Sequence, residues 1–227
     1  MTVKTTALTL TAALALLGAP GPARADNSFS IRISNSWVAD PSFDVVSDND
    51  HLVQAEFNYA RRLLSLWRGE LWVEAAYMAG PSQAVLFGDA IEARAFLQNV
   101  TFSARYAYPV YTWLLPYARF GLGVGVGTLE LESRTAGSTV LDRAAGVAGH
   151  LLVGVEVLWP HRALLTGTSY LTAGVVIEAG YGFGSRLGFE LAPEEDDEIK
   201  RIPLAGSDAG SLDVNGWQLR VGGVLRF

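Results

Sequence analysis

Alternation of apolar and polar residues with a period of two is the feature that most constrains this chain. Between residues 116 and 134, Phe120, Leu122 and Val124 share one parity, whereas Arg119 and several glycines share the other. Such alternation is typical of a β-strand whose two faces meet different surroundings. The pattern recurs along the chain and predicts eight strands, near 28–38, 51–64, 69–80, 92–108, 116–134, 144–158, 169–190 and 212–227.

The first 25 residues have the character of a signal peptide. Lys4 precedes an apolar run at 7–17, glycines and prolines follow, and Ala-Arg-Ala at 23–25 is a small-x-small cleavage site. We therefore expect cleavage after Ala25 and one domain over 26–227. The apolar run is too short to span a bilayer, and no run of 18 apolar residues follows it, so no transmembrane helix is expected.

The distribution of charge predicts which face of the strands points outward. The polar faces carry glutamates, arginines and glycines, whereas the apolar faces carry almost no charge, and Lys200 is the one lysine after the signal peptide. A soluble barrel would scatter charged residues over its outer surface, but a membrane barrel turns apolar residues to lipid and polar residues inward. The sequence therefore predicts an all-β, eight-stranded antiparallel up-and-down transmembrane β-barrel, exported to the bacterial outer membrane.

The lengths of the connections predict the orientation. Membrane barrels have short periplasmic turns and longer external loops. We expect turns near 63–69, 109–116 and 159–168, and external loops near 39–50, 80–91, 135–143 and 188–211. Aromatic residues gather near the periplasmic side, as in an interfacial girdle: Trp67, Tyr108, Tyr111, Trp113, Tyr117, Trp159 and Phe227.

The predicted signal peptide, the eight strands and the alternating last strand that ends at Phe227 resemble one protein family. The chain is similar to the small eight-stranded outer-membrane barrels, such as the transmembrane domain of outer-membrane protein A and outer-membrane protein X. The resemblance implies a monomer in contact with outer-membrane lipids and lipopolysaccharide. The peptidoglycan-binding domain of larger members is missing, so we do not expect tethering to the cell wall. The resemblance also implies that the barrel assembly machinery reads the last strand through Trp217, Leu219, Val221, Leu225 and Phe227.

Charged residues on the polar faces predict a network inside the barrel. The interior of an eight-stranded barrel is just wide enough for side chains to fill, and an unpaired buried charge is costly. We therefore expect a hydrogen-bonded network that fills the lumen, with a narrow pore as the alternative. The predicted members are Glu56, Glu74, Arg105, Arg119, Glu156, Glu178 and Arg220.

Other motifs do not point to catalysis or to a cofactor. The glycines at 121, 123, 125 and 127 alternate within a strand, whereas a nucleotide-binding fingerprint needs a turn and a helix. His51, His150 and His161 form no Ser-His-acid pattern, and no serine is an obvious partner for the inward-facing His150. A lipid A-modifying enzyme is therefore disfavoured, and no cofactor is expected.

Composition excludes further classes of site. The chain has no cysteine, which excludes disulfides and thiolate metal sites, and its net charge of -6 argues against nucleic-acid binding. The acidic run at 194–198 lies in the longest predicted external loop. It is interpreted as solvated, with weak cation binding as the alternative, since hard cations prefer carboxylate oxygens.

Two functions remain open at this stage. The first is a structural or surface-interaction role, in which a filled barrel displays its external loops. The second is a narrow pore or a conduit for small or apolar solutes. A lateral gap between strands, or a continuous lumen, would favour the second.

Overall fold

The structure is a computed structural model that describes most of the chain after the predicted signal peptide. The signal segment 1–25, the acidic run 194–198 and His161 lie outside the described residues. No helix in the described part combines the length and the apolar character of a membrane span. The described residues are 27–38, 40–47, 50–86, 90–133, 139–159, 171–191 and 207–227.

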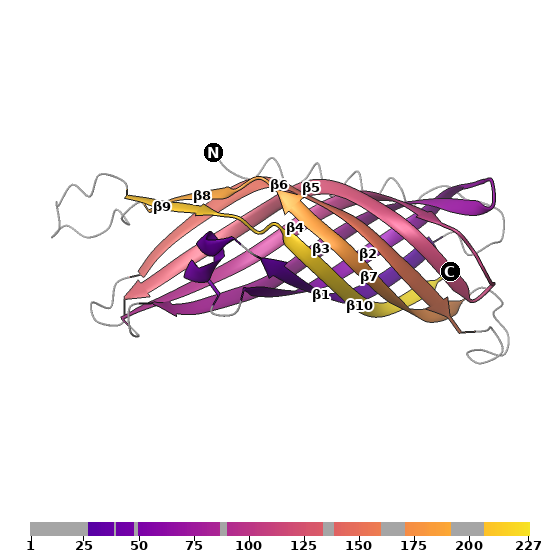
Figure 1. Cartoon of the computed structure of the whole chain (residues 1–227), viewed down its shortest axis with the longest axis horizontal. Coiled ribbons are helices and arrows are strands. Elements are labelled where there is room, and N and C mark those ends of the chain that lie inside the picture. Colours follow the sequence, from indigo (N-terminus) through magenta and orange to yellow (C-terminus); the bar gives the residue numbers. More distant parts are fainter. Residues whose placement is uncertain are drawn as a thin grey trace.

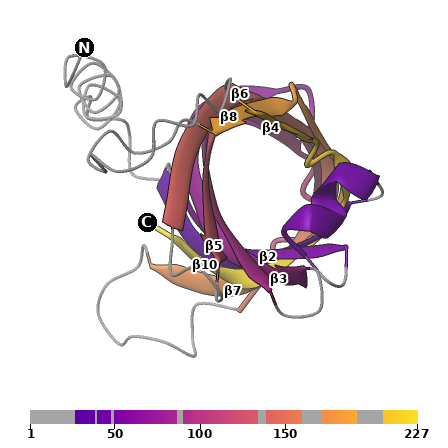
Figure 2. The same ribbon diagram turned by 90° about the vertical axis from the view of Figure 1, so that its left-hand side faces the viewer.

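Eight antiparallel strands close into a barrel, in the order β1-β10-β7-β6-β5-β4-β3-β2 (Figures 1 and 2). The last strand, β10, closes the barrel on β1, and Asn27 and Phe227 exchange two backbone hydrogen bonds of 3.0 and 2.9 Å. The prediction of an all-β, eight-stranded antiparallel barrel is confirmed. The barrel strands are β1 (Asn27–Val38), β2 (His51–Leu66), β3 (Gly69–Leu86), β4 (Ile91–Ala107), β5 (Leu114–Ser133), β6 (Thr139–Leu158), β7 (Thr172–Gly184) and β10 (Gly216–Arg226).

The two ends of the barrel differ. We call the end that carries the 3-10 helix η1 (Pro41–Val45) and the small strands β8 (Leu187–Leu191) and β9 (Ser207–Leu212) the mouth end. The opposite end, with the β2–β3 turn and Phe227, is the turn end. Figure 2 looks along the barrel from the mouth end, where η1 and β8 lie at the rim.

The prediction of one continuous strand over 169–190 is wrong. Strand β7 ends at Gly184, and β8 pairs only with β9, in a separate two-stranded sheet. The hydroxyl of Ser185 accepts a 2.8 Å hydrogen bond from the Val147 amide, and Ser185 N donates to Val147 O at 3.0 Å. Because the Val147 N–H donates to the Ser185 side chain and not to a backbone carbonyl of β7, the hydrogen-bond ladder between β6 and β7 ends here. The chain then leaves the barrel wall.

Two predicted external loops are also shorter than expected. Within 80–91, β3 continues to Leu86 and β4 begins at Ile91, and these two residues still pair. Within 135–143, β6 begins at Thr139, which pairs with Glu132. The strands β3 to β6 therefore extend further towards the mouth end than their neighbours, as Figure 1 shows at its left.

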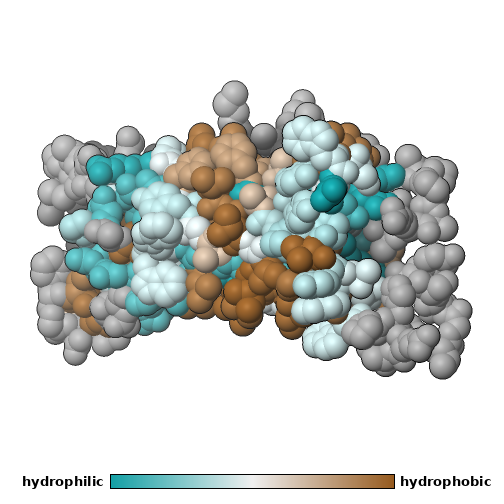
Figure 3. Space-filling view, turned by 45° about the vertical axis from the view of Figure 1, so that its right-hand side comes forward, coloured by the Kyte–Doolittle hydropathy of each residue, from teal (hydrophilic) through white to brown (hydrophobic). Residues whose placement is uncertain are grey.

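A belt of exposed apolar side chains surrounds the middle of the barrel. Figure 3 shows apolar residues gathered across the middle of the visible face, with hydrophilic residues towards its left. The belt consists of outward-facing residues of all eight barrel strands. Its members include Ile31, Ile33, Val53, Phe57, Tyr77, Val100, Phe102, Phe120, Leu122, Val124, Leu151, Val153, Val175, Ile177, Leu219 and Val221.

The polarity of the wall reverses towards the mouth end. In the middle of β5, Leu122 and Val124 face outward and Arg119 is buried inside. A few residues further on, Leu129 is the buried residue, while Glu130 shares the outward parity of Leu122. The outward face thus changes from apolar to charged, and the inward face changes from charged to apolar.

Candidate functional site

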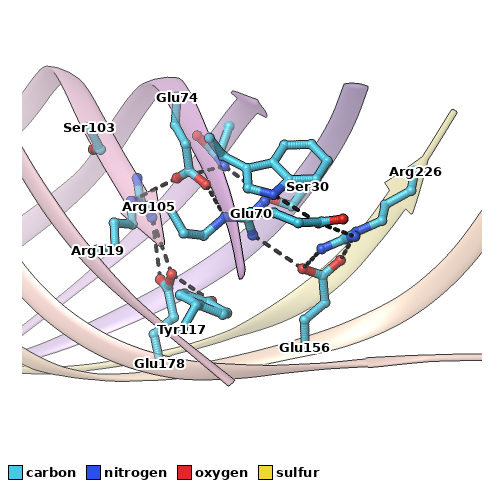
Figure 4. A network of polar contacts seen from close by, with 12 residues as sticks. Ser30, Glu70, Glu74, Ser103, Arg105, Tyr117, Arg119, Glu156, Glu178 and Arg226 are labelled. Atoms are coloured by element: carbon cyan, nitrogen blue, oxygen red, sulfur yellow. Dashed lines mark hydrogen bonds and ion pairs between the residues drawn. The ribbon is translucent and has the colours of Figure 1, made fainter. Parts of the chain in front are cut away.

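The seven residues predicted to line the lumen all lie inside the barrel and are at most 3 % exposed. They come from β2, β3, β4, β5, β6, β7 and β10, one from each strand, because inward positions recur at every second residue. Their side chains converge from opposite walls, as Figure 4 shows for five of them. The structure adds two arginines to this set, Arg32 of β1 and Arg226 of β10, which are 1 % and 6 % exposed.

The Glu56 carboxylate is the centre of the network. Its Oε1 accepts from the Nη1 atoms of Arg32 and Arg119, both at 3.0 Å, and its Oε2 accepts from Nη1 of Arg220. These three arginines reach Glu56 from β1, β5 and β10. One carboxylate thus links three strands across the lumen.

Glu178 is the second shared carboxylate. It lies 3.1 Å from Nη1 of Arg32 and 3.4 Å from Nη1 of Arg119. The hydroxyl of Tyr117 also donates to it, at 2.7 Å. Tyr117 is therefore a lumen residue, and its predicted place in the interfacial girdle is wrong. The reason is parity, since Tyr117 points to the same side as Arg119, opposite to Ala118.

Glu74 connects the centre of the network to the turn end. Its two oxygens lie 2.9 Å from Nε of Arg119 and 2.8 Å from Nε of Arg105. Arg105 then continues to Glu156, at 3.2 Å. The ion pairs form one connected chain along the barrel axis.

The network ends at the turn end in a bidentate pair. Arg226 donates to both oxygens of Glu156, at 2.7 and 2.8 Å. The guanidinium carbons of Arg226 and Arg105 lie 4.8 and 5.0 Å from the ring centre of Trp72, which is completely buried. Such stacking stabilises a desolvated guanidinium group. The indole therefore supports both arginines at this end.

Glycines provide the space that the large lumen side chains occupy. Gly121 lies between Ser103 of β4 and His150 of β6 in the sheet register, and a Cβ atom there would meet the Ser103 hydroxyl and the His150 ring at 2.4 and 2.5 Å. A Cβ at Gly154 would meet the Tyr117 ring at 2.7 Å. Gly121, Gly125 and Gly127 are thus gaps for neighbouring side chains, as expected from the sequence, whereas a Cβ at Gly123 would meet the backbone of Val100 and Thr101.

His150 has a serine partner that the sequence analysis did not identify. Its Nε2 lies 3.2 Å from Oγ of Ser103, across Gly121. The expectation that no serine partners His150 is therefore wrong, because the missing side chain of Gly121 lets two residues on separate strands meet. Among the described residues no hydrogen bond joins His150 to a carboxylate. Without a carboxylate contact, the described residues around this pair do not form a Ser-His-acid arrangement.

An apolar cluster closes the lumen at the mouth end. We call it the mouth cluster. Leu187 and Phe189 of β8 reach the inner face of β5, where a Cβ at Gly127 would meet them at 3.0 and 3.1 Å. Arg186 holds this segment to the rim through Asp40, at 3.4 Å. The cluster consists of Val38, Phe43, Val46, Leu52, Ala95, Leu97, Leu129, Ala144, Leu187, Phe189 and Leu212.

A cavity of about 40 Å³ lies between the charged network and the mouth cluster. Arg220, Gln218 and His150 line it on the network side, and Leu187 and Leu97 line it on the cluster side. Its volume is enough for roughly three water molecules, at about 10–15 Å³ each. The lumen therefore has three layers: ion pairs, a small chamber and an apolar closure.

The remaining candidate residues lie outside the lumen. Nδ1 of His51 is 3.4 Å from the Asn35 side-chain oxygen, and no carboxylate of the described residues forms a hydrogen bond or ion pair with it. Near η1, a hydrogen bond with the Asp50 carboxyl raises the pKa of Asp44. In the described ranges, no three His, Cys, Asp or Glu residues are grouped closely enough to hold a metal ion.

Comparison with known proteins gives matches in structure but not in sequence. No protein-family model matches the sequence, and no curated protein matches it. The crystal structure of Neisserial surface protein A matches with a TM-score of 0.50 and 11 % identity, over 89 % of this chain and 97 % of that chain. The fold is that of a small outer-membrane β-barrel. The predicted resemblance to this group is thus confirmed at the level of the fold.

Two further matches are structures of Ail, the attachment invasion locus protein of Yersinia pestis. One was determined in complex with the heparin analogue sucrose octasulfate. The TM-scores are 0.45 and 0.44, with 13 % identity in each case, and both alignments cover 89 % of this chain and 97 % of Ail.

Proposed function

We propose that this chain is an integral protein of the bacterial outer membrane that anchors and displays a folded external module. The module consists of η1, β8, β9 and the mouth ends of β3 to β6. The observation that carries the proposal is the reversal of polarity along the wall: an apolar belt surrounds a charged lumen, whereas exposed charged residues such as Arg94 and Glu132 lie outside the apolar mouth cluster.

The belt supports the membrane location. Soluble proteins rarely expose contiguous apolar patches of more than a few hundred Å². Here large apolar side chains are exposed on every barrel strand, with Ile33 at 63 % and Val153 at 62 %. Outer-membrane lipids would cover this surface. Around the module, the expected contacts are with the sugars and phosphates of lipopolysaccharide.

The outward face of β10 supports recognition by the barrel assembly machinery. This strand closes the barrel, and the side chains on it or directly after it that face outward are each at least 40 % exposed: Trp217, Leu219, Val221, Leu225 and Phe227. Because these side chains face outward, an assembly factor can reach them before lipid covers the wall. This part of the proposal rests on the resemblance and on their exposure.

The filled lumen favours display over transport. Ion pairs occupy the middle of the barrel, and the mouth cluster packs inside the described part of its mouth end. Reconstituted protein should therefore give at most small, infrequent conductance in a planar bilayer. Large, steady currents would support a pore instead. The buried Ser103–His150 pair, which has no carboxylate partner among the described residues, likewise supports a non-enzymatic role.

Cysteine labelling tests the display directly, since the chain has no cysteine of its own. We expect L141C, at the mouth end, to react with a membrane-impermeant maleimide on intact cells. The matched control is S65C, which is exposed at the turn end and should react only after the outer membrane is permeabilised. Labelling of S65C but not L141C on intact cells would reverse the proposed orientation. Labelling of neither site on intact cells would contradict surface display.

A further inference from the structure

The buried charges of the lumen do not balance. Among the described residues that are at most 6 % exposed in the network, there are five arginines and four glutamates. Glu70 lies at the turn end, 3.2 Å from Arg62 and 3.7 Å from Arg226. When Glu70 and Arg62 are both added to the count, one positive charge is still in excess. A buried charge that is left uncompensated costs several kcal/mol. One negative charge is therefore required inside or beside the network.

The excess is located at Arg220. Its only carboxylate contact in the described structure is Glu56, and Glu56 is shared with Arg32 and Arg119. The Nε atom of Arg220 is buried and has no hydrogen-bond partner among the described residues. Arg105 and Arg226, by contrast, contact Glu156 at the opposite end of the network. The positive charge of the arginines is thus least compensated at the end of the network that faces the cavity.

The cavity wall next to Arg220 presents hydrogen-bond donors. The hydroxyl of Ser36 is buried and lines the cavity, and no residue in the described ranges forms a hydrogen bond with it. The side-chain oxygen of Gln218 accepts from Arg220 at 2.6 Å, which leaves its NH₂ group as the end that can donate to another partner. No Asp or Glu is among the described residues that line the cavity.

We propose that this cavity binds one small monovalent anion, such as chloride, beside Arg220. Its ligands would be the Arg220 guanidinium, the Ser36 hydroxyl and the Gln218 amide. A volume of about 40 Å³ accommodates a halide with a water molecule, but not a large organic anion. The ion neutralises the excess arginine and becomes part of the folded barrel.

An exchange of anions at constant ionic strength separates binding from screening. Equilibrium unfolding of the purified barrel in detergent is followed in sodium chloride and in sodium gluconate, which is too large for the cavity. An anion that binds only the folded state raises stability with the logarithm of its concentration. We expect the unfolding midpoint to rise with chloride and not with gluconate. Equal midpoints in the two salts at every concentration would overturn the proposal.

Variants locate the effect. R220Q removes the excess charge and should abolish the difference between chloride and gluconate. S36A, which removes one donor from a small side chain, should increase several-fold the chloride concentration needed for half of the effect. The control R94Q removes an arginine that is 49 % exposed on the outer surface, and it should leave the difference unchanged. An undiminished chloride effect in R220Q, or its loss in R94Q, would refute a site beside Arg220.

Bromide gives a direct view that does not depend on any variant. In crystals of the wild-type barrel grown with sodium bromide, we expect an anomalous peak in the cavity, within hydrogen-bond distance of Ser36 or Arg220. The same crystals without a peak in the cavity would overturn the proposal. Should R220Q fail to fold, S36A and the bromide experiment still decide the question.

Discussion

The barrel has two halves, the belt half, which the apolar belt surrounds, and the mouth half, which contains the mouth cluster. In the belt half, Arg119 lies inside and Leu122 faces outward, whereas in the mouth half Leu129 lies inside and Glu130 faces outward. Both arrangements belong to the same strand, β5. In the belt half, outward apolar residues suit lipid, so the hydrophobic effect cannot drive them inward, and ion pairs hold the interior together. In the mouth half, outward charged residues suit water and the interior resembles the core of a soluble protein. Whether lipid or water surrounds the wall therefore decides whether the inward face of the strand is charged or apolar.

The largest expected effect comes from breaking the charged interior. E56Q removes the carboxylate that three buried arginines share, so we expect a loss of about 3–5 kcal/mol in the free energy of unfolding. Urea unfolding of the barrel in lipid vesicles measures it. The control is R94Q, because the Arg94 side chain is 49 % exposed and ion pairs of such exposed side chains contribute about 0–1 kcal/mol. Similar losses in E56Q and R94Q would contradict a desolvated lumen.

A comparable but local effect is expected in the apolar interior of the mouth half. Leu187 is 4 % exposed, so L187A should cost about 2–5 kcal/mol within this module. The amides of β8 should then exchange faster with solvent, while those of β7 keep their protection. For L141A, at a position that is 54 % exposed, the exchange should not change measurably. Uniform acceleration over the whole barrel in L187A would show that the two halves are not separate cores.

A smaller effect separates the two outer surfaces. L122R places a charge on the belt, where arginine near the middle of a bilayer costs about 2–4 kcal/mol. L141R places the same charge on the outward face of the mouth half, opposite Glu130, and should change stability by no more than about 0.5 kcal/mol. Unfolding in vesicles compares the two variants. Equal losses of stability in the two variants would mean that the same medium, either lipid or water, surrounds both positions.

The alternation of residues predicted much of this structure. It identified the eight barrel strands, apart from the continuation of 169–190 beyond Gly184 and the lengths of the strands at the mouth end. It also assigned Glu56 and Arg119 to the inward face, because a period of two assigns every residue to one face. Arg32 and Arg226 were not included in the predicted network, although both lie on polar faces. Adding these two arginines to the network requires a count of all charges in the lumen, and the pattern of a single strand does not provide that count.

The mouth half was not predicted, for two physical reasons. First, its core combines Phe43, Leu129 and Phe189 from segments far apart in the sequence, so no local pattern marks it. Second, the departure of β8 from the barrel depends on a single side chain, Ser185, that takes the place of a strand partner. One local signal was present: along 116–134, the apolar residues change parity between Val126 and Leu129. That change marks where the surroundings of the strand change from lipid to water.

Spin labels along β5 test the reversal of polarity most directly. Single cysteines at 120, 122, 124, 129, 130 and 132 are labelled in the barrel reconstituted in vesicles, and collisions with oxygen and with a water-soluble nickel chelate are measured. We expect high oxygen and low nickel accessibility at 120, 122 and 124, the opposite at 130 and 132, and low accessibility to both at 129. High accessibility to the nickel chelate at position 122 would contradict the account. Oxygen accessibility at positions 130 and 132 as high as that at position 122 would also contradict it.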